Sequence, residues 1–231
     1  MVNIILYLYE MHSLGILPLL DWGFKHPTPN KPYGSIIMMF PLMDMDLHYF
    51  IHRHKAPYTF EWFIHNLYRF VQVIDNVHKQ GIIHRDIKSK NILMDSHGNW
   101  WLHDFGNATI LPKNTHTTLV AKMGTHTYRA PELFVENEET IYDGRVDVWS
   151  LGILIYEFLF QRYPFNYRED DEHNIGQFYR KTLFQYWPNI PELAKAHPKL
   201  FEFLSCCLDK NPESRYFPDE LLELPLFHSP C

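Results

Sequence analysis

The feature that most constrains this chain is a polar octapeptide followed closely by a short acidic motif. Residues 84–91 read HRDIKSKN, and DFG begins at Asp104, thirteen residues after Asn91. Transfer of a phosphoryl group with Mg²⁺ needs a proton acceptor, a cation near the moving phosphate and oxygen ligands for the metal. Asp86, Lys88, Asn91 and Asp104 are these residue types at a spacing that predicts this chemistry.

The segment between the two motifs predicts how they meet. An apolar strand is expected at residues 92–94, a turn at 95–99 and a returning strand at 100–102. Such a hairpin would fold Asp104 back beside Asn91, so that two metal ligands converge. A DFG tripeptide alone is weak evidence, whereas the octapeptide with DFG at hairpin distance is specific.

Three further motifs lie downstream. Residues 124–132 read GTHTYRAPE, residues 147–152 read DVWSLG, and residues 211–215 read NPESR. With the two motifs above they follow the order of the eukaryotic protein kinase family, Ser/Thr type, which the chain resembles from about residue 10 to 228. The resemblance implies an α+β, protein kinase-like fold with a truncated small lobe and a mainly helical large lobe.

The resemblance also implies catalytic roles, in a reaction that moves the γ-phosphate of ATP to Ser or Thr of a protein. Asp86 would orient and deprotonate the acceptor hydroxyl, and Lys88 would stabilise the transferring phosphate. Thr125 would lie between these two side chains. Asn91 and Asp104 would hold Mg²⁺. Lys88 favours Ser/Thr over Tyr as the acceptor.

By the same resemblance, residues 41–45 form the hinge that binds the adenine of ATP. Adenine would accept a hydrogen bond from the Met43 N–H and donate one to the Pro41 carbonyl, for which the missing N–H of proline is no obstacle. Leu93 would lie under the adenine. Asp46 would bind the ribose hydroxyls or, alternatively, cap the helix that follows it.

The hinge divides the chain into two unequal parts. Residues 1–40 are expected to be a remnant of the kinase small lobe, and residues 46–231 the large lobe. Strands are expected at residues 16–22 and 35–40. The other expected elements are a helix end at residues 3–11 and a helix over residues 60–80 that Gly81 terminates.

Two phosphate-binding features of the family are expected to be absent. In kinases a Gly-rich loop and then a strand lysine, which pairs with a helix glutamate, precede the hinge. No Gly-rich loop precedes residue 15, and the glutamate position falls near Asn3 or Ile4. We therefore expect the first strands of the small lobe to be missing and phosphoryl transfer to be very slow.

Several motif residues are expected to have structural roles in the family. Asp147 would N-cap its helix and accept hydrogen bonds from the catalytic-loop backbone. Glu132 and Arg215 would form a buried ion pair. His84 and Phe105 would be packing residues.

The segment from Asp104 to Glu132 corresponds to the activation segment, and Arg85 would pair with a phosphothreonine there. The alternative is that its threonines are solvated turn residues, since Val120 and Ala121 occupy the usual positions of the phosphosite. The candidate phosphosites are Thr115, Thr117 and Thr118.

Substrate preference has two opposing signals. The acidic run at residues 169–172 would attract basic residues near the phosphoacceptor, or is a solvated loop. Lys90 would repel an arginine upstream of the phosphoacceptor. At most a weak basic preference follows.

Composition excludes several other functions. The net charge of −6 and the lack of a basic run argue against nucleic-acid binding. The longest apolar run, at residues 148–160, is interrupted by Glu157 and too short for a membrane span. The fifteen histidines are scattered, and only His52 and His54 were near neighbours by sequence, without cysteine support, so a zinc site is not expected.

Cysteine use points to a reducing compartment. Cys206 and Cys207 are adjacent, which makes them poor disulfide partners and suits small apolar positions on a helix; the third cysteine is Cys231. An intracellular location, cytoplasmic or nuclear, follows.

Two functional hypotheses remain. The first is a Ser/Thr protein kinase, favoured by the intact catalytic motifs. The second is a non-catalytic, kinase-like binding or scaffold module, favoured by the missing strand lysine and Gly-rich loop. The sequence leaves the protein substrate, the pathway and the oligomeric state open.

Overall fold

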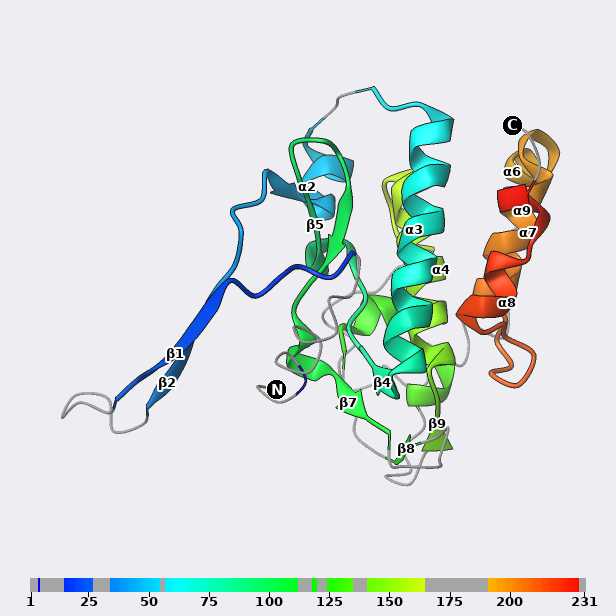
Figure 1. Cartoon of the computed structure of the whole chain (residues 1–231). Coiled ribbons are helices and arrows are strands. Elements are labelled where there is room, and N and C mark those ends of the chain that lie inside the picture. The colour runs from blue at the N-terminus through cyan, green and yellow to red at the C-terminus, as the bar shows by residue number, and fades with distance from the viewer. Residues whose placement is uncertain are drawn as a thin grey trace, which may run out of the picture.

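The structure, a computed structural model, has a mainly helical body from which one long hairpin projects (Figure 1). It describes residues 4, 15–26, 34–54, 57–111, 118–119, 124–134, 141–164 and 191–228. The helices are α2 (Leu47–His52), α3 (Phe60–Lys79), α4 (Arg145–Phe160), α6 (Pro191–Ala196), α7 (Pro198–Cys207), α8 (Pro218–Leu222) and α9 (Pro225–His228). The strands are β1 (Asp21–Lys25), β2 (Ser35–Met39), β3 (Met45–Asp46), β4 (Ile82–Ile83), β5 (Ile92–Met94), β6 (Trp100–Leu102), β7 (Thr109–Ile110), β8 (Thr118–Leu119) and β9 (Ile141–Tyr142).

Helix α3 is the element that the sequence predicted most closely. The Thr59 side chain caps its first turn by accepting a hydrogen bond from the Trp62 N–H at 3.1 Å. The helix ends before Gly81, whose φ of +71° is readily adopted by glycine. Its inward face is apolar and includes Phe63 and Leu67, both fully buried, as expected from their helical spacing.

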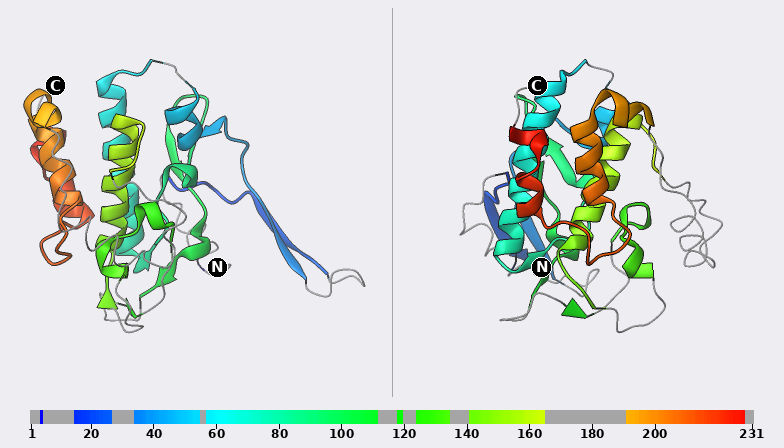
Figure 2. Two further views of the ribbon diagram at one scale, coloured as in Figure 1. Left: turned by 180° about the vertical axis from the view of Figure 1, so that it is seen from behind. Right: turned by 90° about the vertical axis from the view of Figure 1, so that its right-hand side faces the viewer.

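Helix α4 is buried on almost every side and runs antiparallel to α3. Phe158, near its end, stacks on Phe63 near the start of α3, with ring centroids 4.6 Å apart. At the opposite ends, His78 of α3 contacts Asp147 of α4. The two helices form the centre of the body in Figures 1 and 2.

The C-terminal helices cover one side of this central pair (Figure 2). Helix α7 packs on α4, and α8 packs on α3. Cys207 is buried in α7 and Cys206 is partly buried there, so both occupy the small apolar positions that were expected. Cys231 lies outside the described residues. In the described part of the chain, none of the helices has the length and apolar character needed to cross a bilayer.

The predicted catalytic hairpin is confirmed with its bounds. Strands β5 and β6 pair antiparallel, with Ile92 opposite Leu102 and Met94 opposite Trp100. The turn between them is held by Asp95, which accepts hydrogen bonds from the backbone N–H groups of residues 97 and 99. Strand β3, directly after the hinge segment, pairs with β5 and completes a three-stranded sheet.

The projecting hairpin consists of β1 and β2, paired antiparallel (Figures 1 and 2). The second strand agrees with the prediction, but the strand expected at residues 16–22 is wrong, because β1 begins at Asp21. Pro18 has no N–H to donate to a ladder. The preceding residues pack on the body instead: Ile16 bridges Leu102, and the Leu17 N–H donates to the Leu102 carbonyl at 2.9 Å.

Two further sequence expectations change. Asp147 does not N-cap α4: the helix begins at Arg145, the cap position is Gly144, and Asp147 lies inside the first turn. The helix end expected at residues 3–11 lies outside the described residues except for Ile4, which is helical and buried.

Candidate active site

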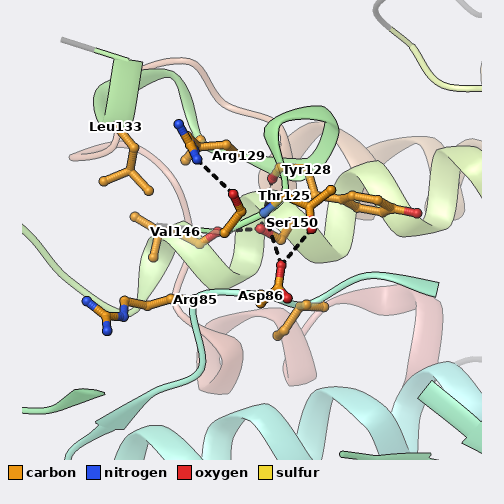
Figure 3. A pocket seen from close by; sticks show the side chains of 11 residues that line it. Arg85, Asp86, Thr125, Tyr128, Arg129, Leu133, Val146 and Ser150 are labelled. Carbon is orange, nitrogen blue, oxygen red and sulfur yellow. Dashed lines mark hydrogen bonds between the residues drawn. The ribbon is translucent and has the colours of Figure 1, made fainter. Parts of the chain in front are cut away.

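The centre of the site is a triangle of three polar side chains. The Lys88 ammonium donates to Asp86 Oδ2 at 2.7 Å and to Thr125 Oγ1 at 2.9 Å. The Thr125 hydroxyl donates to Asp86 Oδ1 at 2.8 Å, and its N–H donates to the same oxygen at 3.0 Å. Thr125 therefore lies between Asp86 and Lys88, as expected, and Figure 3 shows it directly over Asp86.

These contacts keep the Asp86 carboxyl ionised. Burial alone would raise its pKa, but the hydrogen bonds from Lys88 and Thr125 outweigh burial and hold the pKa below its ordinary value. At neutral pH the group is a carboxylate with a fixed orientation. It can accept a hydrogen bond, or a proton, from a hydroxyl placed beside it.

Asn91 is fixed by the same carboxylate. Its amide nitrogen donates to the Asp86 carbonyl oxygen at 2.9 Å and to Asp86 Oδ2 at 3.1 Å. The side chain is buried, and these two bonds aim the nitrogen at Asp86. The amide oxygen, a hard ligand of the kind that Mg²⁺ prefers, is the atom left for a cation.

Asp104 follows the hairpin and returns toward Asn91 as predicted. The His103 N–H donates to the Asn91 carbonyl at 3.1 Å, which places Asp104 one residue beyond that bond. Asp104 has a left-handed backbone, with φ of +62°, and its Oδ1 accepts the Gly106 N–H at 3.2 Å. Its carboxylate is exposed to solvent. An exposed carboxylate and an oriented amide oxygen fit a hydrated Mg²⁺ ion.

Asp147 holds the catalytic loop from below. Its two carboxylate oxygens accept the N–H groups of His84 and Arg85, each at 2.8 Å, and His78 Nε2 lies 2.9 Å from Oδ2. The expected acceptor role is thus confirmed, although the capping role is not. Arg85 has φ of +65°, a conformation that non-glycine residues rarely adopt, and these bonds stabilise it.

His84 and Phe105 pack against each other, as expected, with ring centroids 4.7 Å apart. His84 Nε2 also lies 3.1 Å from the His103 carbonyl oxygen. Burial lowers the pKa of the His84 imidazole, so the ring is neutral and joins the octapeptide to the DFG motif by packing.

The hinge segment shows one residue in its alternative role. Asp46 Oδ1 caps α2 by accepting the Tyr49 N–H at 2.7 Å, as the capping interpretation expected. Leu93 is half-buried and pairs with Asp46 across β3 and β5. Pro41 and Met43 lie in the irregular segment between β2 and β3. The binding of adenine and ribose by these four residues stays a prediction.

The predicted buried ion pair is confirmed. Arg215 Nη1 and Nη2 contact the two carboxylate oxygens of Glu132 at 2.6 and 3.0 Å. The Arg215 guanidinium also donates to the Arg145 carbonyl at 3.0 Å and lies over the ring of Trp149. This pair ties the end of the activation segment to the C-terminal helices.

Arg85 has partners within the fold. Its guanidinium donates to the hydroxyl of Tyr142 at 2.9 Å and to the Asn107 carbonyl. The candidate phosphosites Thr115 and Thr117 lie outside the described residues, and Thr118 is described only as part of β8. The acidic run at residues 169–172 is also outside the described part of the chain.

Sequence reasoning missed a buried polar network next to the catalytic loop. Glu157 is fully buried in α4, and Ser89, Tyr128 and Tyr163 donate hydrogen bonds to its carboxylate. The available signal was that Glu157 is the one charged residue in the apolar run at residues 148–160. A charge in a buried helix requires partners.

Comparisons with known proteins agree with this geometry. A family model described as "Protein kinase domain" matches residues 10–227. Serine/threonine-protein kinase ppk34 of Schizosaccharomyces pombe is 36% identical over 157 residues, which is 68% of this chain and 42% of that protein. Aurora kinase A-B of Xenopus laevis is 39% identical over 151 residues, 64% of this chain and 33% of that protein.

Mitogen-activated protein kinase kinase 2 of Arabidopsis thaliana is 32% identical over 153 residues, covering 65% of this chain and 41% of that protein. The matched part is thus less than half the length of each of these three relatives. The family model nevertheless covers almost the whole of this sequence, and its motifs coincide with the site described above. The chain belongs to the protein kinase family.

Proposed function

We propose that this chain is a Ser/Thr protein kinase domain that transfers the γ-phosphate of ATP to hydroxyl groups of proteins. The observation that carries the proposal is the triangle of Asp86, Lys88 and Thr125, with every edge at 2.7–2.9 Å. Such a group combines a proton acceptor with a fixed positive charge, which phosphoryl transfer to a hydroxyl requires. The Ser/Thr kinase named among the relatives favours the same reaction.

In this proposal each residue of the site has one task. The Asp86 carboxylate accepts a hydrogen bond from the substrate hydroxyl and takes its proton. The Lys88 ammonium stabilises negative charge on the moving phosphate, and Thr125 holds both groups in place. Asn91 and Asp104 would hold Mg²⁺, which when bound neutralises charge on the nucleotide phosphates.

The remaining assignments are part of the same proposal. Residues 1–40 would belong to the small lobe, 41–45 to the hinge and 46–231 to the large lobe. Adenine would contact the backbone of Pro41 and Met43 over Leu93, with Asp46 near the ribose. The protein substrates and an intracellular site of action are proposed on family membership alone.

The expected rate is low for this chain. Its first lysine is Lys25, so the sequence before the projecting hairpin provides no cation for the α- and β-phosphates. Positioning by such contacts supplies much of the rate in phosphoryl transfer, and its loss costs roughly 10²–10⁴ in rate. We expect turnover below the ordinary kinase range of roughly 1–100 s⁻¹.

A phosphate-transfer assay with Mg-ATP and a generic Ser/Thr protein substrate tests the proposal. Asp86→Asn should abolish the activity of the wild-type chain. Asp219→Asn, the same substitution at an exposed position of α8, should retain it. Turnover within the ordinary kinase range, still dependent on Asp86, would show that the positioning argument is overstated.

Nucleotide binding separates the kinase from a binding module. ATP that binds the folded chain raises its melting temperature, and an Mg²⁺-dependent part of that increase should disappear in Asp104→Ala. Equal increases in wild type and Asp104→Ala would exclude Asp104 as the metal ligand. No transfer, together with no effect of ATP, would favour the non-catalytic module.

A further inference from the structure

A second cluster of metal-ligand side chains lies on the other side of the catalytic loop. His48 and His52 are four residues apart on α2, so their rings lie on the same face of the helix, with centroids 4.5 Å apart. Glu157 faces them from α4. The three candidate ligand atoms all lie within 4.8 Å of one another. None of these residues belongs to the proposed Mg²⁺ site.

The separations suit a small tetrahedral ion. Zinc bonds of about 2.0–2.1 Å place neighbouring ligand atoms roughly 3.3 Å apart. Here Glu157 Oε1 lies 3.2 Å from His48 Nδ1 and 2.9 Å from His52 Nε2. Movements of a few tenths of an ångström would open this triangle around an ion.

The surroundings of Glu157 also resemble those of a metal-binding carboxylate. The Ser89 hydroxyl donates to Oε1 at 3.0 Å, Tyr163 donates to it at 3.2 Å, and Tyr128 donates to Oε2. Carboxylates that bind metals are commonly oriented by such outer hydrogen bonds. A fully buried carboxylate also needs positive charge beside it, which an ion would supply.

An ion can reach this cluster from solvent. The side chains of His48 and His52 are 33% and 23% exposed, whereas that of Glu157 is completely buried. Three protein ligands with a solvent-facing side leave a fourth position for water. Two imidazoles and one carboxylate favour zinc-class ions over Mg²⁺, which prefers oxygen ligands.

We propose that His48, His52 and Glu157 form a binding site for a Zn²⁺-class ion next to the catalytic loop. The connection to that loop is Ser89, which contacts Glu157 and directly follows Lys88. The inference is independent of the proposed kinase activity, because it depends only on the cluster.

Calorimetric titration of the metal-free full chain with ZnCl₂ tests the site. We expect one stoichiometric binding event in the wild type and at least tenfold weaker binding in His52→Gln. Glutamine can still donate a hydrogen bond to Glu157, so the fold should survive. His65→Gln, at an exposed position of α3, is the matched control and should bind Zn²⁺ like the wild type.

Thermal unfolding gives a second readout that does not depend on activity. Zn²⁺ should raise the melting temperature of the wild type and of His65→Gln, but not of His52→Gln, and Mg²⁺ should not reproduce the effect. If His52→Gln fails to fold, His48→Gln replaces it. Equal Zn²⁺ binding by the site variant and the control, or no stoichiometric event in the wild type, would show that the histidines only hydrogen-bond Glu157 and would overturn the proposal.

Discussion

At the level of single residues, the position of Thr125 depends on the glycine before it. Gly124 has φ of +84°, and a Cβ added there would lie 2.4 Å from the Arg85 carbonyl oxygen. The activation segment therefore approaches the catalytic loop more closely than any side chain would permit. This close approach allows Thr125 to reach both Asp86 and Lys88.

Gly124→Ala should therefore destabilise the protein by about 1–3 kcal/mol, because it combines a positive φ with a backbone clash. It should also lower phosphate transfer, since relief of the clash moves Thr125 away from Asp86. Chemical denaturation and the transfer assay measure the two effects. Gly23→Ala is the matched control, because its added Cβ would meet nothing within 4 Å. Equal effects at the two glycines would contradict this account.

At the level of elements, the catalytic hairpin depends on the carboxylate of Asp95. Burial alone would raise its pKa, but donors from Asn99, Trp101 and His97 outweigh burial and lower the pKa to about 2. The folded protein thus prefers the ionised form. The resulting stability is fully present above the ordinary carboxyl pKa and is lost as the pH falls through about 2.

Asp95→Asn should accordingly cost roughly 1 kcal/mol at pH 7, a value reduced from the full linkage because the carboxylate is partly exposed to solvent. The difference between wild type and variant should shrink between pH 5 and pH 2, when measured by urea denaturation. Ser96→Ala, at an exposed position of the same turn, should change little at either pH. A difference that stays constant down to pH 2 would mean that Asp95 acts only through its shape.

The elements that the sequence predicted well are those specified by neighbouring residues. Helix α3 has its own cap at Thr59 and its own stop at Gly81. The hairpin from Ile92 to Leu102 has its turn chemistry between its strands. Strand β1 was misplaced because the apolar run at residues 16–19 packs on the body, which periodicity alone does not distinguish from a strand.

The site divides in the same way. The contacts of Asp86, Lys88 and Thr125 were foreseen because fixed motifs carry them. The cluster around Glu157 was not, since it joins α2, α4 and the catalytic loop across more than a hundred residues of sequence. The four-residue spacing of His48 and His52 was visible, but their shared partner becomes evident only in the fold.

At the level of the whole molecule, the β1–β2 hairpin contrasts with the body from which it projects (Figure 1). Both of its faces carry exposed apolar side chains, and a two-stranded sheet of this kind has two unpaired edges. An isolated hairpin is marginally stable in water. The exposed apolar residues of the two strands are Trp22, Phe24, Ile36, Ile37 and Met39.

We therefore expect the isolated chain to self-associate through this hairpin as its concentration rises. Phe24 and Ile36 are cross-strand partners, so Phe24→Lys combined with Ile36→Glu replaces an exposed apolar pair by an ion pair that preserves the register. Sedimentation velocity should show a concentration-dependent mass for the wild type and a monomer for the double variant.

The matched control for this experiment is Ile110→Lys, which places a charge at an exposed apolar position of β7 on the body. It should leave self-association unchanged, because it does not alter the hairpin. If Ile110→Lys suppresses association as strongly as the double variant, added charge rather than the hairpin surface explains the effect. If all three proteins stay monomeric, the hairpin edges are not adhesive, and their exposed side chains need no partner.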